Sequence, residues 1–137
     1  MNNEFNFEFP TIYREFLSQI DKEGEFLIEN TGVVLYSKID LEERNTTYQI
    51  EEWEPDFFLI GQDGDRAFFI KKYSDDTIYM NDLGALGSFE MKRISASIYE
   101  FINYAREHYD EMLNLLPDEL KIDKEQLLNL FDELRNF

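Results

Sequence analysis

The chain has 137 residues, with 30 aspartates and glutamates against 13 lysines and arginines, and a formal net charge of −17. Hydrophobic residues still make up 43% of it, which is typical of a folded and not of a disordered chain. The absence of cysteine excludes disulfides, thiolate zinc sites and cysteine nucleophiles, and the negative charge disfavours nucleic acid and anionic lipid as ligands.

We expect one domain spanning residues 1–137, because no linker, low-complexity tract or internal repeat divides the chain. No apolar run approaches the ~18 residues needed to cross a bilayer. The N-terminus, MNNEFNFEFP, carries acids where a secretory signal would carry basic residues. These features predict a cytoplasmic protein with no membrane partner. We expect the chain to be a monomer or a weak homodimer.

The first predicted element is a helix over residues 11–21, which Pro10 can open and after which Gly24 follows. Its apolar residues are spaced along one helical face: Ile12, Phe16, Leu17 and Ile20. We expect this face to cover a sheet.

Residues 25–37 contain two apolar clusters, 26–28 and 33–36, on either side of Asn30-Thr31-Gly32. This pattern predicts either two strands or one strand after an extended loop. Asp40 and Glu43 then match a capping box, so we expect a short helix over residues 41–48.

The clearest signal is a meander of three strands around residues 55–81. Asp63-Gly64 lies between two apolar runs, 57–60 and 67–70, and such a dipeptide supplies the positive φ angles that a tight hairpin requires. A second turn at residues 74–76 returns the chain as residues 77–80. Aromatic and β-branched side chains on these strands predict an antiparallel sheet with a partner layer.

The C-terminal part is predicted to be helical. Residues 81–88 carry two glycines and indicate a loop that could dock through Leu83, Ala85 and Leu86. Ser97 and Glu100 match a capping box for a long amphipathic helix over residues 98–112. Pro117 separates it from a last helix over 123–135. The predicted fold class is therefore α+β, with the antiparallel sheet packed against N-terminal and C-terminal helices.

Trp53 is the main candidate for a contact with another protein, because it is surrounded by Glu51, Glu52, Glu54 and Asp56. Burial of its indole as core under the sheet is the favoured interpretation, with the acids as a solvated loop. In the alternative, the indole is exposed and anchors a partner, since aromatic residues dominate the energetics of protein interfaces. The acids of the second turn, Asp75 and Asp76, complete the candidate partner-binding residues.

No catalytic, metal or cofactor site is predicted. Asp63 with Asp65, and Asp75 with Asp76, are explained by the preference of aspartate for tight turns. The single histidine, His108, lies outside the apolar stripe of its predicted helix, and a solvent-facing role is favoured over that of a general base. Ser95 and Ser97 suit a helix start better than a nucleophile.

Three groups of residues together resemble the SUKH superfamily, the Smi1/Knr4-like domains common among bacterial immunity proteins. The first group is Pro10, Tyr13, Phe16 and Gly24; the second is Pro55, Phe57, Ile60, Gly61, Asp63, Gly64 and Asp65; the third is Asp82, Ile94, Ser95, Ser97, Phe101 and Ile102. Their order and spacing cover most of the chain. The resemblance implies a single SUKH-like domain that is not an enzyme.

The resemblance also implies a function, namely binding and neutralising a cognate toxin, commonly a nuclease. Such a toxin carries a cationic groove for phosphate, so an acidic inhibitor reaches it quickly by electrostatic steering. Two alternatives stay open: a regulatory or scaffold domain for an endogenous protein, and carboxylate-assisted hydrolysis by the acidic turns. A toxin gene beside this one would distinguish the first possibility from the second, and activity assays on the aspartate variants would test the third.

Overall fold

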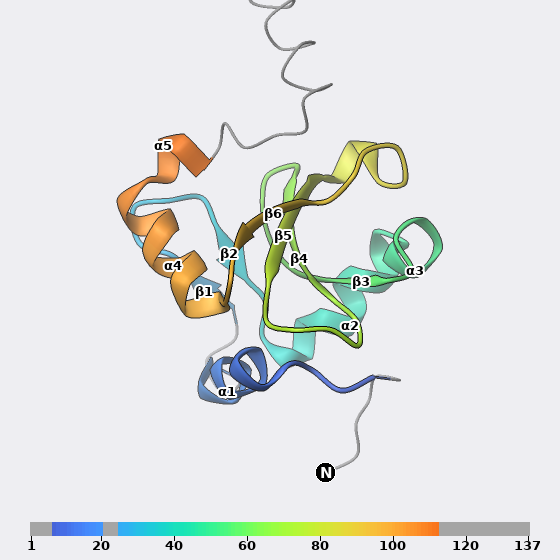
Figure 1. Ribbon diagram of the computed structural model, residues 1–137, viewed down its shortest axis with the longest axis horizontal. Coiled ribbons are helices and arrows are strands. Elements are labelled where there is room, and N and C mark those ends of the chain that lie inside the picture. Colours follow the sequence, from blue (N-terminus) through green and yellow to red (C-terminus); the bar gives the residue numbers. More distant parts are fainter. Residues whose placement is uncertain (1–6, 21–24, 113–137) are drawn as a thin grey trace, which may run out of the picture.

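The computed structural model describes residues 7–20 and 25–112. Its centre is a six-stranded antiparallel sheet whose strands follow one another in sequence order, β1-β2-β3-β4-β5-β6 (Figure 1). The strands are β1 (Phe26–Leu27), β2 (Val34–Leu35), β3 (Phe57–Asp63), β4 (Arg66–Lys71), β5 (Ile78–Asp82) and β6 (Lys92–Ser95). The helices are α1 (Thr11–Ile20), α2 (Lys38–Thr47), α3 (Ile50–Trp53), α4 (Ile98–Glu107) and α5 (Tyr109–Met112), with a 3-10 turn, η1, at Leu83–Ala85. The predicted α+β class is confirmed.

The predicted hairpin forms, with a small difference at its tip. Asp63 pairs with Arg66, so the two loop residues are Gly64 and Asp65 and not Asp63 and Gly64. Gly64 has a φ of 60°, which glycine adopts without steric cost. The second turn is confirmed as well, since β5 returns against β4 with Phe68 opposite Met80.

Both faces of the sheet are covered at its centre. The β4 residues Ala67, Phe68, Phe69 and Ile70 are fully buried, although neighbouring side chains of a strand point to opposite faces. Phe101 of α4 packs on Phe68 with ring centroids 4.7 Å apart. Figure 1 shows α4 and α5 at one side of the sheet and α2 and α3 at the other. The sheet therefore positions two groups of helices far from each other.

The apolar face of α1 differs from the predicted one by one residue. Tyr13, Phe16, Leu17 and Ile20 are buried, whereas Ile12 is 36% exposed. Tyr13 provides the i, i+3, i+4, i+7 spacing that Ile12 lacks with these partners. Gly24 and the end of the predicted helix at Asp21 lie outside the described residues.

The two predicted strands before α2 exist as β1 and β2, paired antiparallel with Phe26 opposite Leu35. The capping box at Asp40 and Glu43 was wrong, because α2 already begins at Lys38 after Ser37. Ser37 is the N-cap residue of α2, and Leu41 in the first turn of the helix is fully buried.

Three features of the second half correct or extend the prediction. The strand β6 and the short helix α3 were not predicted. The capping role of Ser97 is confirmed, because its side chain accepts a hydrogen bond from the Glu100 N–H. The predicted long helix ends at Glu107, and α5 begins after His108. The predicted helix over residues 123–135 and Pro117 lie outside the described residues.

The predicted docking of the 81–88 segment is confirmed in part. Leu83 and Leu86 are partly buried and pack against the core. The Asp82 carboxylate accepts a hydrogen bond from the Gly84 N–H at 2.7 Å, which fixes the start of η1. The first two residues of the segment, however, belong to β5.

Candidate protein-binding surface

The short helix α3 projects from the molecule because the chain turns sharply just before it. Gln49 adopts a left-handed conformation, with φ 56° and ψ 41°, which costs a non-glycine residue about 1 kcal/mol. The turn directs Ile50 into the core, where it is 1% exposed, and leaves the next three residues exposed. We call the exposed residues Glu51, Glu52 and Trp53, together with Glu54 and Asp56, the α3 ridge.

Trp53 is 51% exposed, so the favoured prediction that its indole is core was wrong. The indole lies over the backbone of Gly87, where an added Cβ would come within 3.4 Å of it. Its Nε1 donates a long hydrogen bond of 3.5 Å to Gln49 Oε1. One side of the ring is therefore supported by the molecule, and the remainder is accessible to a partner.

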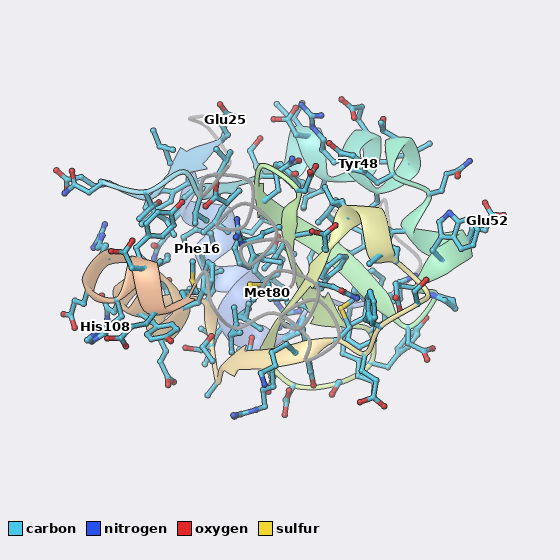
Figure 2. All side chains as sticks on the ribbon, turned by 90° about the horizontal axis from the view of Figure 1, so that it is seen from above. Phe16, Glu25, Tyr48, Glu52, Met80 and His108 are labelled. Carbon is cyan, nitrogen blue, oxygen red and sulfur yellow. The ribbon has the colours of Figure 1, made fainter. Side chains whose placement is uncertain are left out.

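Two of the four ridge carboxylates are held by the fold. Glu51 Oε2 lies 2.9 Å from Lys72 Nζ, and Glu54 Oε2 accepts a hydrogen bond of 2.7 Å from the Gly87 N–H. Within the described part of the chain, neither Glu52 nor Asp56 forms an ion pair. Figure 2 shows Glu52 at the outer edge of the molecule. These two carboxylates are thus available to a cationic partner.

Asp75 and Asp76 do not belong to the α3 ridge, because they lie on the turn between β4 and β5. The Asp76 carboxylate accepts a hydrogen bond from the Tyr13 N–H at 2.9 Å, so it caps the start of α1. Asp75 accepts one from the Thr77 N–H at 3.1 Å. Hydrogen bonds from the Thr77 side chain and backbone hold the pKa of Asp75 below its ordinary value. Both aspartates therefore have structural roles in the turn.

Two hollows flank the ridge. The first, of about 600 Å³, is lined on the ridge side by Glu51 and Glu52, and we call it the carboxylate hollow. The second, of about 590 Å³, is lined by Trp53 and Glu54. Phe57 lines both hollows. The ridge therefore presents Glu51 and Glu52 to one hollow, and Trp53 with Glu54 to the other.

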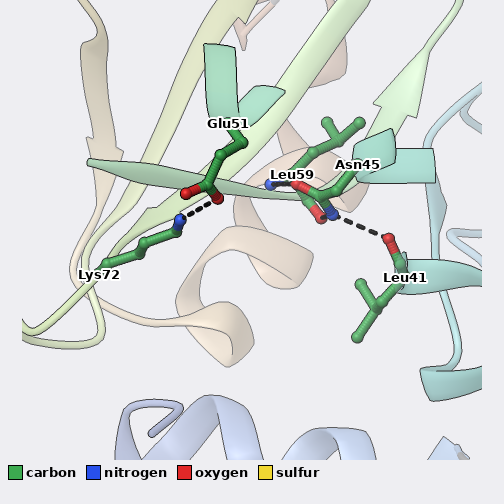
Figure 3. A network of polar contacts seen from close by, with 5 residues as sticks. All are labelled: Leu41, Asn45, Glu51, Leu59 and Lys72. Atoms are coloured by element: carbon green, nitrogen blue, oxygen red, sulfur yellow. Dashed lines mark hydrogen bonds and ion pairs between the residues drawn. The ribbon is translucent and has the colours of Figure 1, made fainter. Parts of the chain in front are cut away.

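A network behind the ridge fixes its position relative to the sheet (Figure 3). The strand β2 reaches only Gly61 and Gln62 of β3, so the first half of β3 has no strand on its outer side. Asn45 of α2 takes the place of that strand. Its amide donates to the Leu59 carbonyl at 2.9 Å and accepts from the Leu59 N–H at 2.8 Å. It also donates to Leu41 O at 2.9 Å.

Lys72 connects the ridge to the opposite wall of the carboxylate hollow. Its N–H donates to Asp56 O at 2.8 Å, while its Nζ pairs with Glu51. The Lys72 side chain is only 8% exposed, and its Nζ lies 5.6 Å from the centroid of the Phe7 ring. Sequence reasoning missed Lys72, Asn45 and Gln49, because no local motif indicates contacts that only the folded chain creates.

The residues considered for catalysis lie elsewhere and have structural partners. His108 and Glu52 are at opposite ends of the molecule (Figure 2), and His108 is half exposed between Glu107 and Glu111. The Ser95 hydroxyl donates to Ser97 O at 2.9 Å. Asp63 accepts a hydrogen bond from the Tyr109 hydroxyl. Burial raises the pKa of Tyr109, and this hydrogen bond raises it further. Among residues 7–20 and 25–112, no three His, Cys, Asp or Glu side chains gather as metal ligands do.

No protein-family model matches the chain, and no curated protein matches it. Across the described helices, none combines the length and the apolar composition that crossing a bilayer requires. The functional argument therefore depends on the geometry and charge of the α3 ridge.

Proposed function

We propose that this chain is a SUKH-like immunity protein that binds and neutralises a cognate toxin with a cationic nucleic-acid groove, without catalysing a reaction. The observation that carries the proposal is the half-exposed indole of Trp53 among the carboxylates of the α3 ridge. The resemblance of the three residue groups to the SUKH superfamily supports the assignment as an immunity protein. The six-stranded sheet with helices at both ends is consistent with it.

The charge explains how such a complex would form. A net charge of −17 attracts a basic partner over a long range, and steering of this kind raises association rates from about 10⁵–10⁶ to as much as about 10⁸–10⁹ M⁻¹s⁻¹ at low salt. Salt screens such attraction, with a Debye length of about 8 Å at physiological ionic strength. The association rate should therefore fall steeply as salt is added.

Trp53 explains how the complex would last. A tryptophan that becomes fully desolvated at the centre of an interface contributes about 2 kcal/mol or more to binding, and most of this appears in the dissociation rate. The indole is already supported by Gly87 and Gln49. Little side-chain freedom is then lost when a partner covers its accessible side.

The test uses the toxin domain that we expect to be encoded beside the gene of this chain, mixed with the chain in a stopped-flow instrument at increasing salt. We expect E52Q/D56N to slow association and W53A to speed dissociation about 30-fold or more, which corresponds to 2 kcal/mol. The matched control is E107Q/E111Q, which removes the same number of charges at the opposite end of the molecule. Equal effects of the two double variants would contradict a role for the ridge.

Two further results would contradict the proposal itself. If this chain binds an endogenous basic protein and gives no protection against the toxin, it is a regulatory or scaffold domain. Hydrolysis by the purified chain that is lost in D63N or D75N would make it an enzyme.

A further inference from the structure

The carboxylate hollow has the composition of a site for an organic cation. Three aromatic residues line it, Phe7, Phe57 and Phe58, of which Phe7 and Phe58 are almost fully buried. Three carboxylates line it too, from Glu42 of α2 and from Glu51 and Glu52 of the ridge. Aromatic faces attract cations electrostatically, and carboxylates bind them through charge-assisted hydrogen bonds.

Lys72 shows that the walls of the hollow already hold one cation. Its Nζ lies 2.9 Å from Glu51 Oε2 and 5.6 Å from the Phe7 ring centroid, with the side chain 8% exposed. An ammonium group removed from water to this extent requires both a charged partner and a favourable environment. The hollow supplies both, so the folded chain already stabilises one cation there.

The charges in the hollow remain unbalanced after Lys72 is counted. One ammonium faces three carboxylates, and Lys72 pairs with Glu51. Among the described residues, Glu42 and Glu52 form no ion pair. The hollow therefore has a net negative charge, which a second cation, from another molecule, would neutralise.

We propose that the carboxylate hollow receives the guanidinium group of an arginine on the bound partner. The arginine would contact the exposed carboxylates of Glu42 and Glu52. Guanidinium fits better than an ammonium group because it is planar, weakly hydrated and donates several hydrogen bonds to carboxylates. The volume of about 600 Å³ falls within the range of about 300–1,000 Å³ of ligand sites. The inference rests on the proposed function for the source of the arginine.

The groups around the rim support the choice of arginine. Asn45, Thr46 and Gln49 line the hollow beside Glu42 and offer neutral hydrogen-bond acceptors to guanidinium N–H groups that a carboxylate does not reach. Gln49 is held by its left-handed backbone and by the bond to Trp53. An arginine in the hollow would therefore lie on the flank of α3 opposite the indole-lined hollow, so one partner could engage both sides of the ridge.

The experiment needs no toxin. The isotope-labelled chain is titrated with the peptide N-acetyl-Gly-Arg-Gly-amide and, as a neutral isostere, with the same peptide carrying citrulline. We expect the arginine peptide to shift the NMR signals of the Asn45 and Gln49 side-chain amides and of residues 50–53. Citrulline should bind at least about tenfold more weakly, because it forms no charge-assisted hydrogen bonds.

Two variants locate the binding site. E42Q/E52Q should weaken arginine-peptide binding about tenfold, whereas E107Q/E111Q, which removes two charges far away, should leave it within about twofold of the wild type. K72M should strengthen binding by at least about threefold, because it frees Glu51 from its internal partner. All the substituted glutamates are exposed, but Lys72 is not. The NMR spectrum of K72M is therefore checked to be unchanged for residues away from the hollow.

The inference is overturned if shifts spread evenly over the acidic surface, if citrulline binds as well as arginine, or if both double variants lose binding equally. Weaker binding by a folded K72M would overturn the idea that Lys72 occupies a cation position. If the peptide fails but the toxin is neutralised, the inference falls and the proposed function stands. If the peptide binds in the hollow but no toxin is neutralised, the proposed function falls and the arginine site stands.

Discussion

Replacing Asn45 with alanine tests whether this side chain stands in for the missing neighbour strand of β3. Its amide satisfies both the N–H and the carbonyl of Leu59, at 2.8 and 2.9 Å, and Leu59 itself is fully buried. Each polar backbone group left without a partner costs about 1–3 kcal/mol. The lost bond to Leu41 adds about 1 kcal/mol.

Two effects reduce the expected loss. Alanine is the better helix former, by about 0.5 kcal/mol. Asn45 also lines the carboxylate hollow, so water can reach part of the exposed backbone. The free energy of unfolding of N45A should therefore fall by about 2–4 kcal/mol.

Urea unfolding followed by tryptophan fluorescence and circular dichroism measures this change. With an m value, the slope of unfolding free energy against urea concentration, of about 2 kcal/mol/M, the midpoint urea concentration should fall by about 1–2 M while the m value stays constant. Thr46→Ala is the matched control, because it changes the next, exposed residue of the same helix and mainly reports helix propensity. If N45A lies within about 0.5 kcal/mol of this control, water replaces the amide fully and the reasoning is refuted.

Three further predictions concern the fold around the site. Gly61→Ala should cost about 3 kcal/mol of unfolding free energy, because the new Cβ would lie 2.5 Å from the Val34 carbonyl oxygen; urea unfolding measures it. Thr77→Val should raise the pKa of Asp75 toward its ordinary value of 3.8, as read by NMR titration of the carboxyl carbon. Tyr13→Phe should leave stability unchanged or raise it by about 1 kcal/mol, because among the described residues the buried hydroxyl has no hydrogen-bond partner.

Each of these has a result that would contradict it. Gly64→Ala is the control for Gly61, since its added Cβ meets nothing within 4 Å and only its φ of 60° is strained, at about 1 kcal/mol; an equal loss at both sites would refute the clash. A lowered pKa gives Asp75 a stabilising effect that is present above pH 3.8 and lost as the pH falls through the folded value. An unchanged Asp75 pKa in Thr77→Val would contradict the hydrogen bond from the Thr77 side chain. A loss of more than about 1 kcal/mol of unfolding free energy in Tyr13→Phe would mean that the Tyr13 hydroxyl has a hydrogen-bond partner after all.

The elements that sequence reasoning predicted correctly depend on local signals. The β3–β4 hairpin follows from two apolar runs joined by residues that accept positive φ. The helix α4 begins directly after its N-cap, Ser97, because the serine side chain accepts a hydrogen bond from a residue three positions away. Such signals act over a few residues and survive in the folded chain. The buried set of α1 was predicted except for one residue, because Tyr13 and Ile12 are both apolar enough to face the core.

The elements that were missed depend on distant contacts. The strand β6 carries Lys92 and Arg93 and lacks a continuous apolar run; it is a strand because β5 pairs with it. Charged side chains are typical of an edge strand, which lowers its signal in the sequence. The helix α3 has only four residues, too few for any periodicity, and its orientation depends on Gln49.

The same reasons explain the partial prediction of the binding surface. The four acids around Trp53 were identified from their density in the sequence, and all four share the α3 ridge with the indole. Exposure of Trp53 could not be inferred, because it depends on how α3 leaves α2. Neither could the hollow beside the ridge, whose walls come from α2, α3, β3 and the residues around Phe7 and Lys72.

The most direct test of the central claim is a growth assay in cells that express this chain together with the toxin that we expect to be encoded beside its gene. We expect the wild-type chain and E107Q/E111Q to restore growth, and a variant combining E52Q, W53A and D56N to fail although it folds and accumulates normally. Growth restored equally by the ridge variant, or no protection by the wild-type chain, would contradict the account.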